Sequence, residues 1–322
     1  RTAAEAADYL DKAVDGVSVG FGGSVTLDAM GLYDRLGRHN TVIWHWKQEA
    51  NAARKAAMQT QVYLTSANGQ LIHSGITIID PYTGNIVGMV GAMGPKTQNL
   101  VDNYAVQKHQ VGSSIKPLTV YSAALDAGAV TPATTFDNYP VELMNNSPWP
   151  KNSPNTYTGW TMIGEGVRRS INTIAVQTVE ALGVAESYAY ATEKLGLSLV
   201  PEDMAVSPLA MGGLTYGLST VEMAAAFSAF ANSGVYNSPK MYTEVRDSNG
   251  ETVLKNEGET HVAMKETTAY FMNQMLTSVV NAGTGTSAKF SGMTIAGKTG
   301  TTDNSKTRYF VGYTPYYCDA VW

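Results

Sequence analysis

Extended, β-branched segments stand early and late in this chain, and a long block of helical patterns separates them. Residues 75–94 hold two β-branched runs around the turn sequence DPYTG at 80–84, which predicts a hairpin. Three further runs, at 293–300, 308–314 and 316–322, predict strands near the end of the chain. Because strands joined by short links pair antiparallel, the pattern predicts one mainly antiparallel, five-stranded sheet.

The block between these strands is predicted to be mainly helical. Several of its segments end on glycine, as helix C-termini often do. The predicted helices are residues 117–128, 164–183, 187–196 and 218–234. Residues 131–159, rich in Pro, Asn and Ser, are predicted to form a loop, and 240–254 a hairpin with an Asn-Gly turn. The fold class is therefore α+β, an α/β sandwich with a large helical insertion between the early and late strands, and a cleft is expected at the junction.

Length and composition limit the domain organisation and the classes of partner. Of the 322 residues, 71–322 are predicted to form one domain, and 1–70 a linker or N-terminal packing segment. Lys and Arg total 22 against 27 Asp and Glu, a net charge of −5, so nucleic acid is not expected as a partner. Cys318 stands alone and the histidines lack metal-site spacing, so neither a metal nor a cofactor is expected. The chain begins at Arg1, so we expect a fragment of a longer protein.

The stretch HQVGSSIKPLTVY, from His109 to Tyr121, places a lysine in the first turn of a predicted helix. Pro117 is tolerated only in that turn, so the helix begins near Ser113 or Ser114, where a serine commonly caps the backbone. Lys116 is unfavourable there, because the helix dipole repels an ammonium. Ser113 lies one turn before Lys116 on the same face, and a lysine of lowered pKa can act as a base toward its hydroxyl. The sequence therefore marks Ser113, rather than Ser114, as a candidate nucleophile.

A second candidate motif is Ser170-Ile171-Asn172, which follows two arginines. Its ordinary explanation is a helix start with Ser170 as the cap. Its functional explanation is that Ser170 relays a proton while the Asn172 amide binds a substrate carbonyl or amide. The motif alone does not decide between them.

A third candidate is GKTGTT at 297–302, at the end of a predicted strand. Gly300 has no side chain, so a ligand backbone can lie against the strand and pair with it. Lys298 supplies a cation, and Thr299 and Thr301 supply hydroxyls, a combination that suits a terminal carboxylate. The phosphate-loop pattern is absent. Alone, the segment could equally be a strand that runs into a turn.

The order and spacing of the three motifs carry a family resemblance. The gaps are 170 − 113 = 57 and 298 − 170 = 128 residues. S-x-x-K, an S-x-N element and K-T-G occur together in penicillin-binding proteins and class A β-lactamases. The chain resembles these penicillin-recognising serine acyltransferases, and more closely the transpeptidase domain of class A penicillin-binding proteins. The resemblance covers about residues 71–322 and is densest at 103–128, 164–177, 209–236 and 295–315.

The resemblance implies a role for each motif residue. Ser113 attacks the carbonyl of the penultimate D-Ala of a stem peptide, and Lys116 takes its proton. Ser170 passes a proton to the leaving D-Ala nitrogen. The backbone N–H groups of Ser113 and Thr301 form the oxyanion hole. The implied catalytic residues are Ser113, Lys116, Ser170 and Lys298, and the implied substrate-binding residues are Asn172, Thr299, Gly300 and Thr301.

The resemblance also implies an activity, partners and a location. The expected activity is that of a serine D,D-transpeptidase that cross-links peptidoglycan stem peptides ending in D-Ala-D-Ala, with carboxypeptidase activity when water replaces the acceptor amine. The expected inhibitors are β-lactam antibiotics. The full-length protein is expected to be anchored at the extracytoplasmic face of the bacterial cell membrane, with a glycosyltransferase domain. A helix that normally packs on the sheet is expected beyond Trp322.

Two alternatives within the same superfamily remain open at this point. A serine β-lactamase needs fast deacylation, but the E-x-x-L-N segment that supplies the deacylating glutamate in class A β-lactamases is absent. The second motif also reads SIN instead of SDN, although Ser170 and Asn172 keep their places. A β-lactam-sensing domain would still be acylated, so the motifs alone do not separate it from an enzyme.

Overall fold

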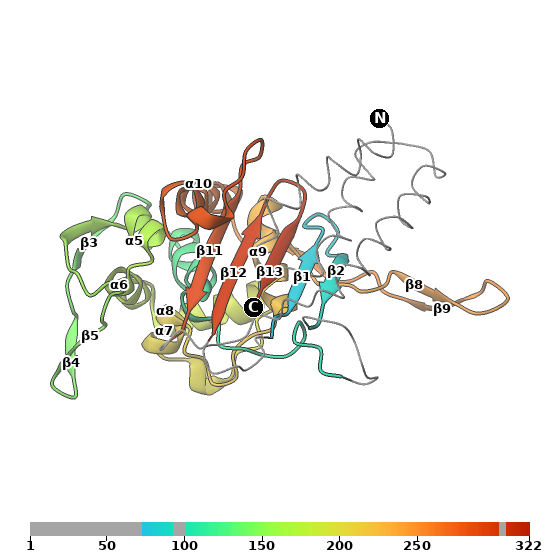
Figure 1. Cartoon of the computed structure of the whole chain (residues 1–322), viewed down its shortest axis with the longest axis horizontal. Coiled ribbons are helices and arrows are strands. Elements are labelled where there is room, and N and C mark those ends of the chain that lie inside the picture. The colour runs from blue at the N-terminus through green and yellow to red at the C-terminus, as the bar shows by residue number, and fades with distance from the viewer. Residues whose placement is uncertain (1–72, 93–100, 303–306) are drawn as a thin grey trace, which may run out of the picture. The chain divides into compact units, whose positions relative to one another are not determined.

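The computed structural model describes residues 73–92, 101–302 and 307–322 (Figure 1). The chain divides into two compact units, one of residues 1–75 and 90–104 and a larger one of residues 76–89 and 105–322. In the smaller unit the rings of His73 and Tyr104 stack with centroids 4.6 Å apart. The segment predicted for residues 1–70 lies outside the described residues. The larger unit holds all three candidate motifs.

Its central sheet has five strands in the order β11-β12-β13-β1-β2 (Figure 1). Neighbouring strands from β11 to β1 pair antiparallel, with Thr299 opposite Phe310 and Ile79 opposite Cys318. This arrangement confirms the predicted sheet of two early and three late strands. The strands are β1 (Ile76–Ile79), β2 (Ile86–Val90), β11 (Ala296–Thr301), β12 (Arg308–Tyr313) and β13 (Cys318–Val321). Strand β11, which carries the KTG motif, is therefore an edge strand.

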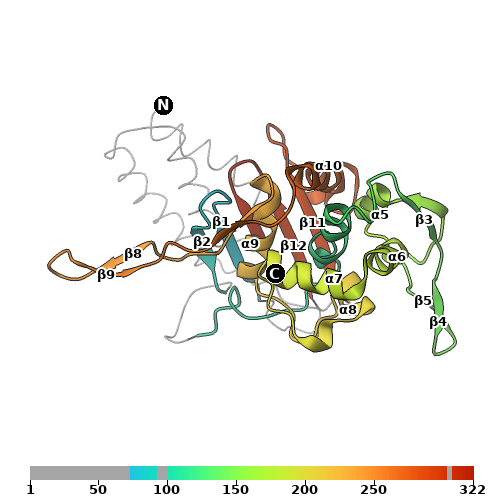
Figure 2. The ribbon, with the colours of Figure 1, turned by 180° about the vertical axis from the view of Figure 1, so that it is seen from behind.

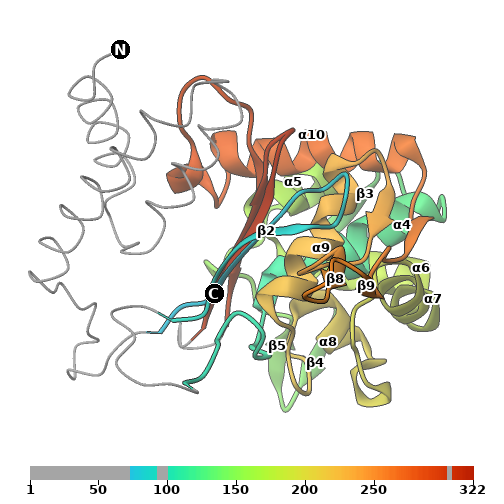
Figure 3. The same cartoon turned by 90° about the vertical axis from the view of Figure 1, so that its right-hand side faces the viewer.

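Helices cover the sheet and are the main secondary structure between β2 and β11. Figure 3 shows the sheet edge-on, with α4, α6, α7, α8 and α9 on one side of it. The α-helices are α4 (Ser122–Asp126), α5 (Ile163–Arg169), α6 (Asn172–Leu182), α7 (Val184–Ala189), α8 (Val206–Met211), α9 (Thr220–Ala231) and α10 (Glu266–Ala282). The short and irregular helices are η1 (Gly112–Ile115), η2 (Pro117–Tyr121), η3 (Tyr190–Lys194), η4 (Pro201–Asp203) and η5 (Thr286–Ala288).

Helix α9 forms the middle of the core. Its sequence is apolar on nearly all sides, and such a helix is stable only when it is surrounded by protein. It packs against β1 and β13, and in the reverse view it lies in front of the strands (Figure 2). Its start is well defined, because Ser219 and Glu222 form a reciprocal capping box. The large buried rings of Phe227 and Phe230 contact each other edge to face, with centroids 5.5 Å apart.

Short strand pairs surround this core. The 240–254 hairpin is confirmed as β8 (Glu244–Arg246) and β9 (Thr252–Lys255). The prediction of a loop at 131–159 is wrong, because this segment contributes strands to two antiparallel strand pairs. The remaining pairs are β3 (Thr135–Asn138) with β6 (Gly159–Met162), β4 (Glu142–Met144) with β5 (Ser147–Trp149), and β7 (Val235–Asn237) with β10 (Thr260–Val262). The prolines and asparagines of residues 131–159 are typical of loops, so the sequence pattern did not indicate these strands.

Two helix predictions need correction. The single helix predicted for 164–183 is two helices, α5 and α6, because Ser170 adopts the left-handed conformation with φ 61° and ψ 39°. Helix α10 was missed altogether, although its buried residues Met272, Leu276 and Val279 follow the helical period. Its threonines and aromatic residues weaken the local helical signal, and packing against α5 and β11 stabilises it instead.

Candidate active site

The nucleophile segment is held by close backbone contacts between η1 and β11. A Cβ at Gly300 would overlap the Val111 carbonyl oxygen, and a Cβ at Gly112 would come within 2.6 Å of the Thr301 carbonyl oxygen. Gly112 also has φ +52°, in the left-handed region that glycine adopts without strain. The absence of a side chain at Gly300 is therefore required by the protein's own packing, a reason that differs from the ligand approach expected from the sequence.

The two serines of this segment lie in different surroundings. Ser114 is buried and its hydroxyl donates a hydrogen bond of 2.7 Å to the Val111 carbonyl. Ser113 is half-buried, and within the described part of the chain its hydroxyl has no hydrogen-bond partner. The helix begins at Gly112, one residue before the predicted start near Ser113 or Ser114, with Val111 as the N-cap and no side chain capping it. The capping explanation of the serine pair is therefore wrong.

Lys116 is completely buried below this segment and reaches the second motif. Its Nζ donates hydrogen bonds to the Ser170 carbonyl at 2.9 Å and to Asn172 Oδ1 at 2.6 Å. Burial, and secondarily the nearby Lys298 charge, hold the pKa of Lys116 well below its usual value. An uncharged amine has two N–H groups and one lone pair. The two acceptors take both N–H groups and leave the lone pair of Nζ available to accept a proton.

Lys298 is the second buried lysine of the site. Its Nζ donates to Ser170 Oγ at 2.8 Å and to the Thr299 carbonyl at 2.9 Å. Burial lowers its pKa to about 7. Within the described residues neither Lys116 nor Lys298 forms an ion pair with a carboxylate, so the cluster is electropositive whenever either lysine is charged.

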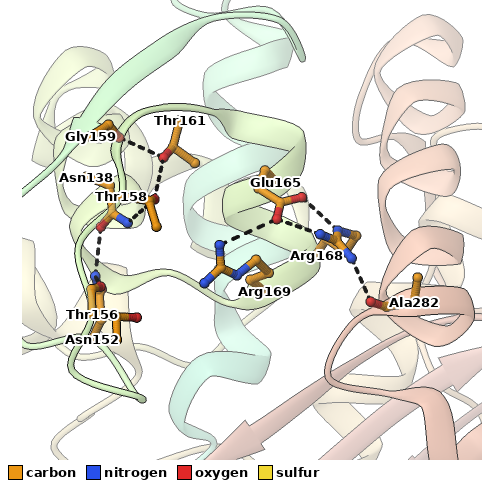
Figure 4. Close-up of polar contacts among 10 residues, drawn as sticks. All are labelled: Asn138, Asn152, Thr156, Thr158, Gly159, Thr161, Glu165, Arg168, Arg169 and Ala282. Carbon is orange, nitrogen blue, oxygen red and sulfur yellow. Dashed lines mark hydrogen bonds and ion pairs between the residues drawn. The ribbon is translucent and has the colours of Figure 1, made fainter.

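The position of Ser170 is fixed by the end of α5. Arg168 donates two hydrogen bonds to Glu165, of 2.7 and 2.6 Å, and a third to the Ala282 carbonyl at the end of α10 (Figure 4). The helix ends at Ser170, whose left-handed conformation reverses the chain before α6 begins. This reversal brings Ser170 Oγ to Lys298 and the Ser170 carbonyl to Lys116.

The start of α6, which carries Asn172, is held by a distant segment. Helix α6 has no local side-chain cap. Instead Asn152 Oδ1 accepts the backbone N–H groups of Asn172 and Thr173 at 3.0 and 3.3 Å, the bonds that a cap residue normally makes. The Asn172 side chain in turn donates to the Lys151 carbonyl at 2.7 Å.

A second buried asparagine supports Asn152. Asn138 Oδ1 accepts hydrogen bonds from Asn152 Nδ2 at 2.7 Å and from the Thr173 hydroxyl at 2.6 Å. Its own amide nitrogen donates to Thr158 at 2.9 Å (Figure 4). Sequence reasoning missed both asparagines. Asparagine is common in loops, and only the folded chain places these two beside the second motif.

The third motif lies along β11 beside η1. The hydroxyls of Thr299 and Thr284 are 2.6 Å apart, and Thr301 is exposed at the end of the strand. Hydrogen bonds join Lys116, Ser170, Asn172 and Lys298. At Gly300 the backbone of β11 lies directly against the nucleophile segment. Within the described residues no three His, Cys, Asp or Glu side chains gather as metal ligands would.

Comparisons with known proteins identify the family of this chain. The family model of the penicillin binding protein transpeptidase domain matches residues 74–322. A second model, that of the LUD domain, matches residues 1–101, less than half of the chain, and overlaps the first match. Penicillin-binding protein 1A of Clostridium botulinum (strain Hall) is 36% identical over 274 residues, 81% of this chain and 33% of that protein. Penicillin-binding protein 4 of Bacillus subtilis is 31% identical over 271 residues, 82% of this chain and 42% of that protein.

Solved structures show the same fold. The D,D-transpeptidase domain of a peptidoglycan glycosyltransferase from Eggerthella lenta has a TM-score of 0.65 at 25% identity, over 77% of this chain and 72% of that one. Penicillin-binding protein 1A from Haemophilus influenzae has a TM-score of 0.67 at 21% identity, over 80% of this chain and 45% of that one. The chain spans about a third of the length of the first curated relatives it matches. By its family match over residues 74–322, the chain belongs to the penicillin-binding protein transpeptidase domain family.

Proposed function

We propose that this chain carries a serine D,D-transpeptidase site, which cross-links peptidoglycan stem peptides through an acyl-enzyme on Ser113 and is acylated by β-lactams. The observation that carries the proposal is the pair of buried lysines, Lys116 and Lys298, both hydrogen-bonded to Ser170. Lys116 is also hydrogen-bonded to Asn172, and the half-buried Ser113 stands three residues before it. Such a cluster supplies both a proton acceptor and a proton donor without a histidine.

Acylation begins when Ser113 Oγ attacks the carbonyl of the penultimate D-Ala. The proton of Oγ passes to the lone pair of Lys116 Nζ, whose uncharged form is favoured because burial lowers its pKa. The new C–O bond gives a tetrahedral oxyanion. The backbone N–H groups of Ser113 and Thr301 are the proposed donors to this oxyanion, and donors fixed in place before the reaction lower the barrier most.

Collapse of the tetrahedral intermediate breaks the C–N bond to the terminal D-Ala. The leaving nitrogen needs a proton, and Ser170 Oγ supplies it, since this hydroxyl is hydrogen-bonded to Lys298 Nζ and can be reprotonated from there. Lys116 also contacts the Ser170 carbonyl, so both lysines meet at one residue. The acceptor amine of a second stem peptide then attacks the ester carbonyl and gives up a proton through Ser170 Oγ to Lys298. The ester C–O bond breaks as Lys116 returns its proton to Ser113 Oγ.

Strand β11 is the proposed binding surface for the donor peptide. As an edge strand it has a sheet neighbour, β12, on one side, and an extended peptide can pair with the other. Lys298, Thr299 and Thr301 are the proposed partners of the terminal carboxylate, and Asn172 of a substrate amide. Asn172 Nδ2 keeps a second N–H beside the one donated to Lys151.

The full-length protein is proposed to carry a glycosyltransferase domain and a membrane anchor, and to act at the extracytoplasmic face of the cell membrane. The names of the relatives, penicillin-binding protein 1A, support this proposal. In the part of the chain that the structure describes, no helix combines the length and apolar character needed to cross a bilayer.

A fluorescent penicillin tests the proposed site. We expect a stable label on the wild-type chain, no label on Ser113→Ala, and near-normal labelling of Ser114→Ala, because the Ser114 hydroxyl is committed to the Val111 carbonyl. A label that turns over within minutes would identify a β-lactamase instead. A wild-type chain that takes no label would overturn the proposal. A lipid-linked pentapeptide assay then measures cross-linking itself.

A further inference from the structure

A small polar pocket lies beside the second motif. It has a volume of about 30 Å³, and Arg169 and Ile171, the two neighbours of Ser170, both line it. Further lining residues come from the segment that begins at the cap residue Asn152, namely Asn152, Ser153, Pro154 and Thr156. The pocket therefore shares its backbone with the motif that positions Ser170, and a group bound there lies next to the active site.

The charge at this pocket is not balanced by its neighbours. Glu165 accepts two short hydrogen bonds from Arg168, which neutralises its charge. The Arg169 guanidinium forms a second, longer ion pair with the same carboxylate, with Nη1 3.7 Å from Oε1, and its side chain is exposed (Figure 4). No Asp or Glu lines the pocket. Two guanidinium groups therefore share one carboxylate, which leaves a net charge of +1 beside the pocket.

The remaining lining groups suit an anion that can accept hydrogen bonds. Within the described part of the chain, the hydroxyls of Ser153 and Thr156 have no hydrogen-bond partner. The amide of Asn152, by contrast, is fully used by Asn138 and Thr156 and keeps the wall rigid. A guanidinium with two hydroxyls nearby matches the planar, two-oxygen geometry of a carboxylate.

From this arrangement we infer that the pocket binds a carboxylate of the peptide substrate, distinct from the terminal carboxylate proposed to bind at Lys298, Thr299 and Thr301. The inference rests on the proposed function, since it assumes that a peptide occupies the adjacent site. Arg169 supplies the charge, and Ser153 and Thr156 supply further donors. The pocket is a specificity site, so it distinguishes substrates without taking part in the acyl transfer.

The test uses synthetic pentapeptides that end in D-Ala-D-Ala. Each carries either a free carboxylate or its primary amide on the first, second or third residue, and release of D-alanine gives kcat/KM. At one position we expect the wild-type chain to prefer the carboxylate by about tenfold, the size expected for one charge-assisted hydrogen bond. Arg169→Gln should abolish that preference by lowering kcat/KM for the carboxylate peptide without changing kcat/KM for the amide peptide. Arg169→Lys should keep part of the preference.

Controls separate this inference from the proposed function. Arg246→Gln removes an exposed, paired arginine on the β8–β9 hairpin and should leave the preference unchanged. Penicillin labelling reports on the acyl-transfer groups and not on the pocket, because the single carboxylate of penicillin is the counterpart of the terminal carboxylate proposed to bind at Lys298, Thr299 and Thr301. Failure of the wild type to label overturns the proposed function. Normal labelling with no carboxylate preference at any position, or with a preference that survives Arg169→Gln, overturns the inference about the pocket.

Discussion

Two helix starts carry the proposed catalytic groups, and they are held in place by different forces. The start of η1, with Ser113, is fixed by shape, because Gly112 and Gly300 allow the backbones of η1 and β11 to touch. The start of α6, with Asn172, is fixed by hydrogen bonds from Asn152, which lies twenty residues earlier in the chain. Lys116 and Lys298 then join both regions at Ser170.

The difference teaches how each region should respond to change. Close-packed backbones have no room to relax, so an added methyl group forces one element away from the other. A hydrogen-bond network is more tolerant, because water can replace part of a lost bond when the site is close to solvent. We therefore expect a severe response at the nucleophile segment and a graded response at the second motif.

The largest effect is expected from Gly300→Ala. Its new methyl group would overlap the Val111 carbonyl oxygen and press on Ser114, which should lower the free energy of unfolding by about 3 kcal/mol. Penicillin labelling should fall with it, since η1 must move away from β11. Urea denaturation and labelling rates measure the two effects.

A matched control for Gly300→Ala is Gly213→Ala. A Cβ at Gly213 meets nothing within 4 Å, and its φ is not in the left-handed region. This variant should keep both the stability and the labelling of the wild type. Equal losses in the two variants would show that the contact between η1 and β11 is not what the glycine protects.

The next effect comes from Lys298→Met, tested at two pH values. Burial lowers the pKa of Lys298 from 10.5 to about 7, so between these values the unfolded chain binds a proton that the folded chain lacks. The free energy of unfolding therefore rises with pH across this window. Replacing the lysine should stabilise the chain by about 2 kcal/mol at pH 6 and by much less at pH 10. If the increase in the free energy of unfolding were the same at both pH values, burial of the charged lysine would not be its cause.

Asn152→Ala should have a graded effect. It removes the cap of α6 and leaves Asn138 with an unsatisfied acceptor site, a loss of about 1–2 kcal/mol in the free energy of unfolding. The rate of acylation by penicillin should also fall, because Asn172 and its bond to Lys116 lose their support. Thermal unfolding and stopped-flow labelling give both values.

Asn155→Ala is the control for Asn152→Ala within the same segment. Asn155 is exposed and accepts one hydrogen bond from the neighbouring Tyr157 hydroxyl. Its removal should leave the acylation rate unchanged. If both variants acylate at the wild-type rate, Asn152 stabilises the fold without positioning the second motif.

The smallest effect is expected from Thr284→Val. Its hydroxyl contacts that of Thr299 on the exposed side of β11, where water can take its place. The free energy of unfolding should fall by less than about 1 kcal/mol, and the rate of penicillin labelling should stay within a few-fold of the wild-type rate. A loss as large as that of Gly300→Ala would mean that hydrogen bonds, and not shape, hold β11 in place.

Much of the fold follows from local pattern. The strands at both ends of the insertion, the 240–254 hairpin and helix α9 carry strong periodicity or turn signals, and the structure has them all. Helix α10 and the pairs β3–β6 and β4–β5 lack such signals, because contacts from outside these segments stabilise them. The break at Ser170 is similar: a continuous helical pattern runs through 164–183, and only the structure reveals the left-handed residue.

The sequence by itself determined which side chains are present for the chemistry, since Ser113, Lys116, Ser170 and Lys298 stand at spacings that identify the family. The tertiary structure decided what those side chains can do. Burial removes water from both lysines and lowers their pKa values, which depends on the whole core rather than on neighbouring residues. The tertiary structure also places Asn138, Asn152 and the Arg169 pocket beside the second motif. These contacts join segments that are distant in the chain, so no local sequence pattern predicts them.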